Sequence, residues 1–309
     1  MKNKDVSIQM VRIIAMFSII LCHLVQELNN TDIAKMGQFF NVGVYIFLLL
    51  SGWLYGGKEI RDTREWLFER AKRVLLPMWI FMIFLFGIYC FQGTMKWVYI
   101  PIYLTNTQYW IGQVEGGAHL WFISVIFLCY LMVPLLQKIK NNLIIIILGM
   151  VISGYILCYL NHTMGMTILY ASIFAIGYWI KIQNVKVEWQ FTIVFIGLAL
   201  IIRLISRKIL DGTVLYDCLL VYVTHTVLAI GLFFFERQIL RIKSNKIINW
   251  LDDMSYFIYI THYMFMVGPI RTMGLTDSLL TNIAITIVAS FSIAIALQMI
   301  YTRIVQKSQ

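Results

Sequence analysis

Charged side chains are scarce in this sequence, and acidic ones are the scarcer kind. Only 13% of the residues are Asp, Glu, Lys or Arg, whereas 60% are hydrophobic and the mean hydropathy is +0.79. A soluble domain with a single membrane anchor is excluded, because the apolar residues are spread over many long segments. The composition therefore predicts a polytopic protein of the lipid bilayer.

Paired cysteines, a cleavage site and a linker are also missing. The five cysteines lie in or next to apolar segments without any Cys-x-x-Cys pair, so we expect neither a disulfide nor a metal site. No small-residue cleavage site follows the first apolar segment, which predicts a retained helix rather than a signal peptide. No change in composition divides the chain, so residues 1–309 are predicted to form one domain.

What the chain has in abundance is apolar segments long enough to cross a bilayer. About ten can be recognised, at approximately 8–27, 39–56, 74–92, 119–137, 143–160, 165–181, 190–208, 214–235, 254–270 and 280–304. Pairs of Asn, Gly or Asp, which favour turns, separate several of them. We therefore predict an all-α polytopic membrane protein with about ten transmembrane helices.

The net charge of +10 does not indicate a nucleic-acid partner, because the basic residues fall in short loops between apolar segments. With the N-terminus inside, eighteen Lys and Arg residues lie on the cytoplasmic side and six on the outer side. This asymmetry predicts that both termini are cytoplasmic. Three cations on the outer side do not fit this asymmetry: Arg203, Arg207 and Lys208. They either snorkel to the outer surface or form an outward-facing site for an anion.

The first apolar segment carries two ionisable residues, Arg12 and His23. At about 100° per residue, the eleven-residue spacing brings both onto one helix face, about 16 Å apart along the axis. Ionisable groups inside a membrane helix are costly to bury and are candidates for function. Considered separately, Arg12 could extend to the membrane surface, and His23 could be a hydrogen-bonded polar residue between helices. Because the two residues share one helix face, they predict a site that has a fixed positive charge and a proton acceptor.

Two more regions carry polar residues that could bind a ligand. Arg70 and Arg73 share a helix face just before the third segment, where two guanidinium groups could clamp a phosphate or could only supply positive-inside charge. The aromatic stretch 93–118 fits either an interfacial belt or a sugar-binding lip.

Segments four and nine hold the remaining candidates. Segment four begins with His119 and Trp121, and His119 is expected at its outer mouth. In segment nine, Ser255 and Tyr259 precede His262, which lies at a depth comparable to that of His23.

Taken together, these pieces resemble the acyltransferase-3 family of integral membrane enzymes, which O-acylate cell-surface glycans. The matching pieces follow the family order over nearly the whole chain: Arg12-x10-His23, the Leu-Ser-Gly-Trp-Leu run at 50–54, Arg70-x-x-Arg73 before Pro77, His119 to Pro134, and the run that ends at His262. Many members have Ser-x-Glu-Glu-Gln in segment four, whereas here Ser124 is followed by Val125, Ile126 and Phe127. We expect the branch without an appended esterase-like domain.

The resemblance implies a reaction and a role for each candidate. Acyl-CoA, by default acetyl-CoA, would be the donor, with its phosphates on Arg70 and Arg73, and a glycan or lipid-linked saccharide hydroxyl would be the acceptor. His23 would act as base, by direct transfer or through an acyl-histidine, and Arg12 would position the donor or stabilise the developing anion. His262 is a second candidate base. His119, Trp121, Ser255 and Tyr259 are candidate acceptor-binding residues. No metal is expected, and the location implied is a bacterial cytoplasmic membrane, crossed many times.

Two other classes fit parts of the pattern. A transporter or flippase for a glycan or small polar solute would also need many helices and intramembrane charge, but it would have no use for a clamp on CoA phosphates. A membrane-bound regulator without activity would bind no acyl-CoA at all.

Overall fold

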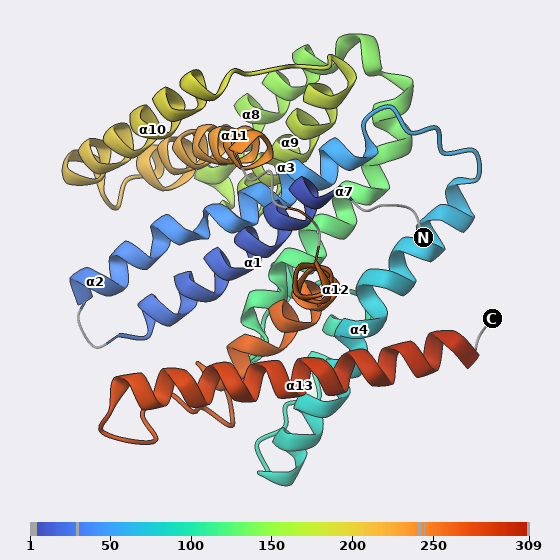
Figure 1. The fold of residues 1–309 in the computed structure, drawn as a ribbon, viewed down its shortest axis with the longest axis vertical. Coiled ribbons are helices and arrows are strands. Elements are labelled where there is room, and N and C mark those ends of the chain that lie inside the picture. Colours follow the sequence, from blue (N-terminus) through green and yellow to red (C-terminus); the bar gives the residue numbers. More distant parts are fainter. Residues whose placement is uncertain (1–4, 29–30, 240–242, 244, 308–309) are drawn as a thin grey trace. The chain divides into compact units, whose positions relative to one another are not determined.

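A computed structural model describes residues 5–28, 31–239, 243 and 245–307 of the chain. Within those ranges the backbone forms helices joined by turns and short loops, and no strand is present (Figure 1). The prediction of an all-α fold is therefore confirmed.

The helices follow one another with short connections. In chain order they are α1 (Val6–Gln26), α2 (Thr31–Met36), η1 (Gly37–Asn41), α3 (Val42–Tyr55), α4 (Thr63–Phe91), α5 (Tyr99–Leu104), α6 (Gln108–Ile111), η2 (Ala118–Leu120), α7 (Trp121–Lys138), η3 (Lys140–Asn142), α8 (Leu143–Leu160), α9 (His162–Ile182), α10 (Trp189–Leu210), η4 (Leu215–Leu220), α11 (Val221–Ile239), α12 (Lys246–Thr261), η5 (His262–Phe265) and α13 (Leu279–Lys307).

Eight helical segments in the described ranges are long and apolar enough to cross a membrane. They are Val6–Gln26, Ile33–Tyr55, Thr63–Phe91, Ala118–Lys138, Leu143–Leu160, His162–Ile182, Leu215–Ile239 and Leu279–Lys307. The chain is thus a multi-pass membrane protein. The two other predicted spans correspond to α10, which ends in a group of cations, and to α12, which has only 16 residues before it tightens into η5. The count of ten and the cytoplasmic position of both termini stay predictions.

The described helices form two compact units, each of which has its own packing. The first unit takes its residues from Met1–Ala15, Asn41–Thr63 and Leu128–Asn249, and the second from Met16–Phe40, Arg64–Phe127 and Trp250–Gln309. Helices α1 and α7 contribute to both units. The assignment of residues 1–309 to one domain stays a prediction.

The first unit is built on close helix packing. Helix α9 packs against α3 and α8, and α11 packs against α3 and α10 (Figure 1). Glycines allow the closest crossing: a Cβ atom on Gly52 of α3 would lie 1.9 Å from the Phe174 carbonyl oxygen, and one on Gly177 of α9 would lie 2.0 Å from that of Leu49. Backbones can approach so closely only where no side chain intervenes, as the small residues at 51–52 predict.

The second unit is joined by hydrogen bonds from side chains to carbonyl groups of other helices. The Tyr256 hydroxyl of α12 donates to the Val74 carbonyl of α4 at 2.6 Å, and Thr261 donates to the Ser290 carbonyl of α13 at 3.0 Å. Inside a bilayer such bonds fix the neighbours of a helix, because water offers no alternative partner. Helix α12 and the tight turn η5 are thereby held between α4 and α13.

The aromatic stretch 93–118 folds into α5, α6 and η2. Tyr103 is 1% exposed, and its hydroxyl donates to the Gly117 carbonyl at 3.1 Å, so this ring is part of the packing. Trp97 is 68% exposed, which leaves it available to the interface or to a ligand. The aromatic residues here therefore divide into a structural group and an exposed one.

Candidate functional site

Three histidines from distant parts of the sequence meet in the second unit. The ring centroid of His262 lies 5.4 Å from that of His23 and 4.9 Å from that of His119. Tyr263 closes the group, with its ring 4.7 Å from His23 and 5.1 Å from His119. We call His23, His119, His262 and Tyr263 the histidine cluster.

Local backbone structure explains how each histidine reaches the cluster. His23 lies in the last turn of α1, His119 lies in the short turn η2 before α7, and His262 begins η5 where the α-helical turn of α12 tightens. Tyr259, one turn before His262, donates its hydroxyl to the His119 carbonyl at 2.5 Å. This hydrogen bond connects η2 to α12 and so fixes the position of His119 relative to the helix that precedes His262.

Hydrogen bonds determine which nitrogen of each buried ring carries a proton. His262 Nδ1 lies 2.7 Å from the Tyr259 carbonyl oxygen, and His119 Nε2 lies 3.0 Å from the Ile260 carbonyl oxygen. A carbonyl only accepts, so these two nitrogens carry the hydrogen of a neutral ring. The other nitrogens, His262 Nε2 and His119 Nδ1, then hold lone pairs, and both are buried without a hydrogen-bond partner in the described part of the chain.

Burial differs across the cluster. His262 is 1% exposed and His119 is 3% exposed, whereas His23 is only half-buried. His119 therefore lies inside the unit, where η2 packs it against α12, and its position at the outer mouth of segment four stays a prediction. Unpartnered acceptors in a buried site are costly, and a ligand that donates a hydroxyl hydrogen would satisfy them. The arrangement can accept a proton or hold a hydroxyl group.

Arg12 lies about three turns before His23 on the same helix. Helix α1 runs without interruption over Val6–Gln26, so the calculated shared face of Arg12 and His23 holds for a real helix. Arg12 is half-buried and belongs to the first unit, while His23 belongs to the second. Its assigned role at the donor stays a prediction.

Arg70 and Arg73 lie in the N-terminal half of α4, which continues without a break into the membrane span. Arg70 is half-buried and Arg73 is exposed. Arg73 and Glu69 both interact electrostatically with Tyr301 of α13, so a carboxylate lies on the same surface as the Arg73 guanidinium group. Their binding of CoA phosphates stays a prediction.

The other residues singled out in the sequence have different surroundings. Ser255 is buried, and its hydroxyl donates to the Asp252 carbonyl within α12 at 2.8 Å. Trp121 is half-buried with its ring centroid 5.0 Å from that of Tyr109, in the aromatic stretch rather than among the histidines. Tyr259 contacts the cluster through His119, as described. Sequence reasoning missed Tyr263, whose only signal was its position next to His262.

Among the described residues, no group of three or more His, Cys, Asp and Glu side chains has an arrangement that could hold a metal ion. The three histidines of the cluster do not form such a group. That the protein works without a metal stays a prediction.

Comparison with known proteins gives one match. The family model Acyl_transf_3, described as an acyltransferase domain, matches residues 5–300. This range includes every residue of the histidine cluster as well as Arg12, Arg70 and Arg73. No curated protein matches the chain, and no solved structure matches it.

Proposed function

Because the chain belongs to the acyltransferase family whose model covers residues 5–300, we propose that this membrane acyltransferase is an O-acyltransferase that uses the histidine cluster. It moves an acyl group, by default acetyl, from acyl-CoA to a hydroxyl of a glycan or lipid-linked saccharide. The observation that carries the proposal is the pair of buried, unpartnered imidazole nitrogens on His262 and His119, next to half-buried His23.

The chemistry of the step calls for such a group. An acceptor hydroxyl is a weak nucleophile, so a base has to take its proton as it attacks. In our proposal the hydroxyl oxygen bonds to the thioester carbonyl carbon while its proton passes to the imidazole of His23. The carbon–sulfur bond then breaks, and the departing thiolate of CoA takes the proton back. No group is consumed, and the base returns neutral.

The other residues position the reactants. His262 and His119 offer lone pairs that hold the acceptor hydroxyl or the protonated ring of His23. Burial lowers the local dielectric response, which makes each of these hydrogen bonds matter more than it would in water. Arg70 and Arg73 bind the CoA phosphates, and Arg12 positions the donor or stabilises the anion that develops on the thioester oxygen.

Binding and slow hydrolysis of acetyl-CoA by the purified chain in nanodiscs test the proposal. We expect the intact chain to bind acetyl-CoA and to release CoA thiol without any acceptor. His23→Ala should lose thiol release by about 10²- to 10⁴-fold while it retains binding. His162→Ala is the matched control, because His162 is an exposed histidine at the start of α9.

The same experiment separates the competing classes. A transporter or flippase would move its solute without cleaving a thioester, and an inactive regulator would bind no acetyl-CoA. Full thiol release by well-folded His23→Ala would remove His23 as the base. No binding by the intact chain would reject the acyl-CoA reaction.

A further inference from the structure

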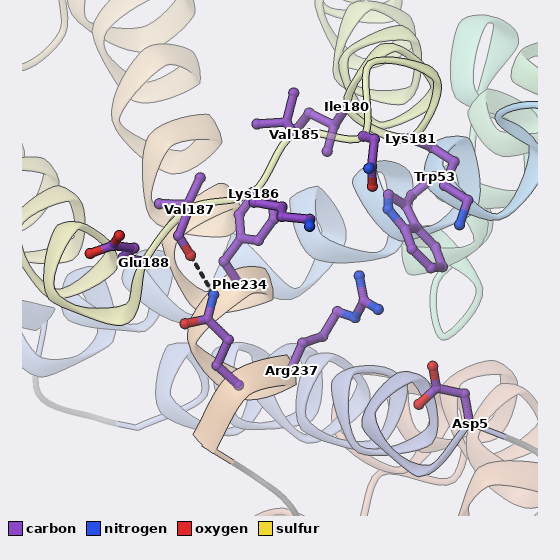
Figure 2. A pocket seen from close by; sticks show the side chains of 12 residues that line it. Asp5, Trp53, Ile180, Lys181, Val185, Lys186, Val187, Glu188, Phe234 and Arg237 are labelled. Carbon is purple, nitrogen blue, oxygen red and sulfur yellow. Dashed lines mark hydrogen bonds between the residues drawn. The ribbon is translucent and has the colours of Figure 1, made fainter.

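The first unit contains a pocket that the proposed reaction does not use. It has a volume of about 710 Å³ and lies where the ends of α9 and α11 meet the loop 183–188 (Figure 2). Trp53 of α3 and Asp5 complete its lining. All of its residues belong to the first unit, whereas the histidine cluster belongs to the second.

Two cations from different helices converge on one ring in this pocket. The Lys181 Nζ atom of α9 lies 4.1 Å from the centroid of the Trp53 ring, and the Arg237 Cζ atom of α11 lies 4.3 Å from it. The two charges are therefore no farther apart than the sum of those distances. Lys186 of the connecting loop lines the same pocket. Cation–π contacts hold Lys181 and Arg237 in place although like charges repel.

Positive-inside charge explains only part of this arrangement. Lys181 and Arg237 each lie in the last turn of a helix, where the dipole favours a cation, and both are on the expected cytoplasmic side. Neither effect requires the two side chains to meet in a pocket. The Arg237 Nε–H group is also buried and has no hydrogen-bond partner in the part of the chain that the structure describes. A buried donor without an acceptor is costly, so an anion that fills the pocket would relieve it.

The carboxylates near the pocket do not cancel its charge. Asp5 interacts electrostatically with Arg237, and Glu188 lies beyond Val187, away from the Trp53 end (Figure 2). Gln238 donates its side-chain amide to the Val187 carbonyl, which fixes the loop against α11 (Figure 2). Three cations thus face two carboxylates, and only one carboxylate is at the end where Lys181 and Arg237 meet.

We propose that this pocket binds the phosphate group of an anionic ligand. A guanidinium group offers several N–H donors in a planar fork and a lysine adds a mobile charge, a combination that suits phosphate oxygens. Two sources share this chemistry: a soluble organic phosphate of the nucleotide kind and the headgroup of an anionic phospholipid. The inference stands apart from the acyl transfer and does not depend on it.

The test compares two sources of phosphate and three single variants of the full chain. In phosphatidylcholine nanodiscs, binding of 3′,5′-ADP and of pyrophosphate is measured by calorimetry. In a second arm, retention of phosphatidylglycerol is measured by native mass spectrometry. The variants are Arg237→Gln, Lys181→Gln and, as the matched control, Lys138→Gln, whose lysine is exposed at the end of α7 outside the pocket.

We expect one of the two sources to bind, with affinity reduced about tenfold or more in Arg237→Gln and Lys181→Gln and unchanged in Lys138→Gln. Binding that Arg237→Gln and Lys181→Gln weaken identifies a soluble phosphate in the first arm and a lipid headgroup in the second. The variants are needed because 3′,5′-ADP is a part of CoA and would also bind at Arg70 and Arg73 in our proposed function. If neither source binds, or if all three variants bind alike, the proposal is overturned. Lys181 is exposed, so Lys181→Gln decides the outcome even if Arg237→Gln does not fold.

Discussion

Each unit contains a buried histidine whose Nδ1 atom contacts a backbone carbonyl of the preceding helical turn, yet the surroundings of the two rings differ. His225 of α11 in the first unit is 2% exposed, and its Nδ1 lies 3.0 Å from the Val221 carbonyl oxygen. His262 in the second unit makes the equivalent contact with Tyr259. His225 packs its ring 5.0 Å from Tyr45 and makes further contacts, whereas His262 Nε2 has no partner among the described residues.

The difference extends to the units around them. The first unit is held by backbone contacts at glycines, and its converging cations line a pocket. The second unit is held by side-chain hydrogen bonds and has acceptor nitrogens at its centre. Satisfied polar groups stabilise a fold, while unsatisfied buried ones indicate a ligand or a reaction. The comparison therefore supports the proposals of proton transfer in the second unit and of anion binding in the first.

The largest effect should come from filling the glycine contact of the first unit. Gly52→Leu places a side chain where the Phe174 carbonyl oxygen would be 1.9 Å from its Cβ, and backbone cannot move aside cheaply. We expect a loss of about 3 kcal/mol or more, which leaves little folded protein. Gly149→Leu of α8 is the control, since nothing lies within 4 Å of its Cβ position. Thermal unfolding in detergent measures both; equal stability of the two variants would contradict the packing.

The next largest effect separates the two buried histidines. His262→Ala should reduce thiol release from acetyl-CoA by about 10²- to 10⁴-fold with the fold retained, because it removes the lone pair that holds the attacking hydroxyl or the protonated ring of His23. His225→Ala should instead cost stability, by about 1–3 kcal/mol, while the folded fraction keeps its activity. Thiol release and thermal unfolding are measured on each variant. The opposite pattern would reverse the roles of the two units.

A smaller effect is expected at the arginines that we propose bind the donor. Arg70→Gln should raise the KM for acetyl-CoA about tenfold and leave kcat nearly unchanged, because a phosphate contact far from the thioester is lost. Arg64→Gln is the matched control, since Arg64 is an exposed arginine in the first turn of the same helix. Steady-state kinetics distinguish the two parameters. A fall in kcat with KM unchanged would place Arg70 at the reacting atoms instead.

The smallest effect concerns the bond that ties His119 to α12. Tyr259→Phe removes the hydroxyl that donates to the His119 carbonyl at 2.5 Å and should cost about 1 kcal/mol of stability. Tyr155→Phe removes an exposed hydroxyl bond to Tyr159 in the first unit and should cost almost nothing. Chemical unfolding of the two variants measures the difference. Equal losses would show that the buried bond does not hold the cluster together.

The sequence was sufficient for the helical fold and for some of the site. Apolar segment lengths predicted the spans, and eight of them match described helices that are long and apolar enough to cross a membrane, whereas α12 has only 16 residues. The 12–23 spacing on α1 was predictable because helix geometry is regular. The close crossing of α3 and α9 at Gly52 and Gly177 was not predictable, since helix neighbours depend on tertiary structure.

The convergence of the site was not predictable in the same way. His119 and His262 are far apart in the sequence, and only the fold of η2 brings their rings together. The proton positions depend on which backbone carbonyls face each ring, and no residue type encodes that. In the sequence, Lys181 and Arg237 contributed only to the positive-inside charge. Their convergence on Trp53 depends on the packing of three helices, which the sequence pattern does not show.

The central claim is that the histidines of the second unit act as one proton-transfer centre, and a double-mutant cycle on His23 and His262 tests it most directly. Thiol release from acetyl-CoA is measured for the intact chain, His23→Ala, His262→Ala and the double variant in nanodiscs. Residues that act as a unit show losses that are not additive. We predict that the double variant loses about as much rate as the more damaged single variant. Losses that multiply, or single variants with full activity, would contradict the claim.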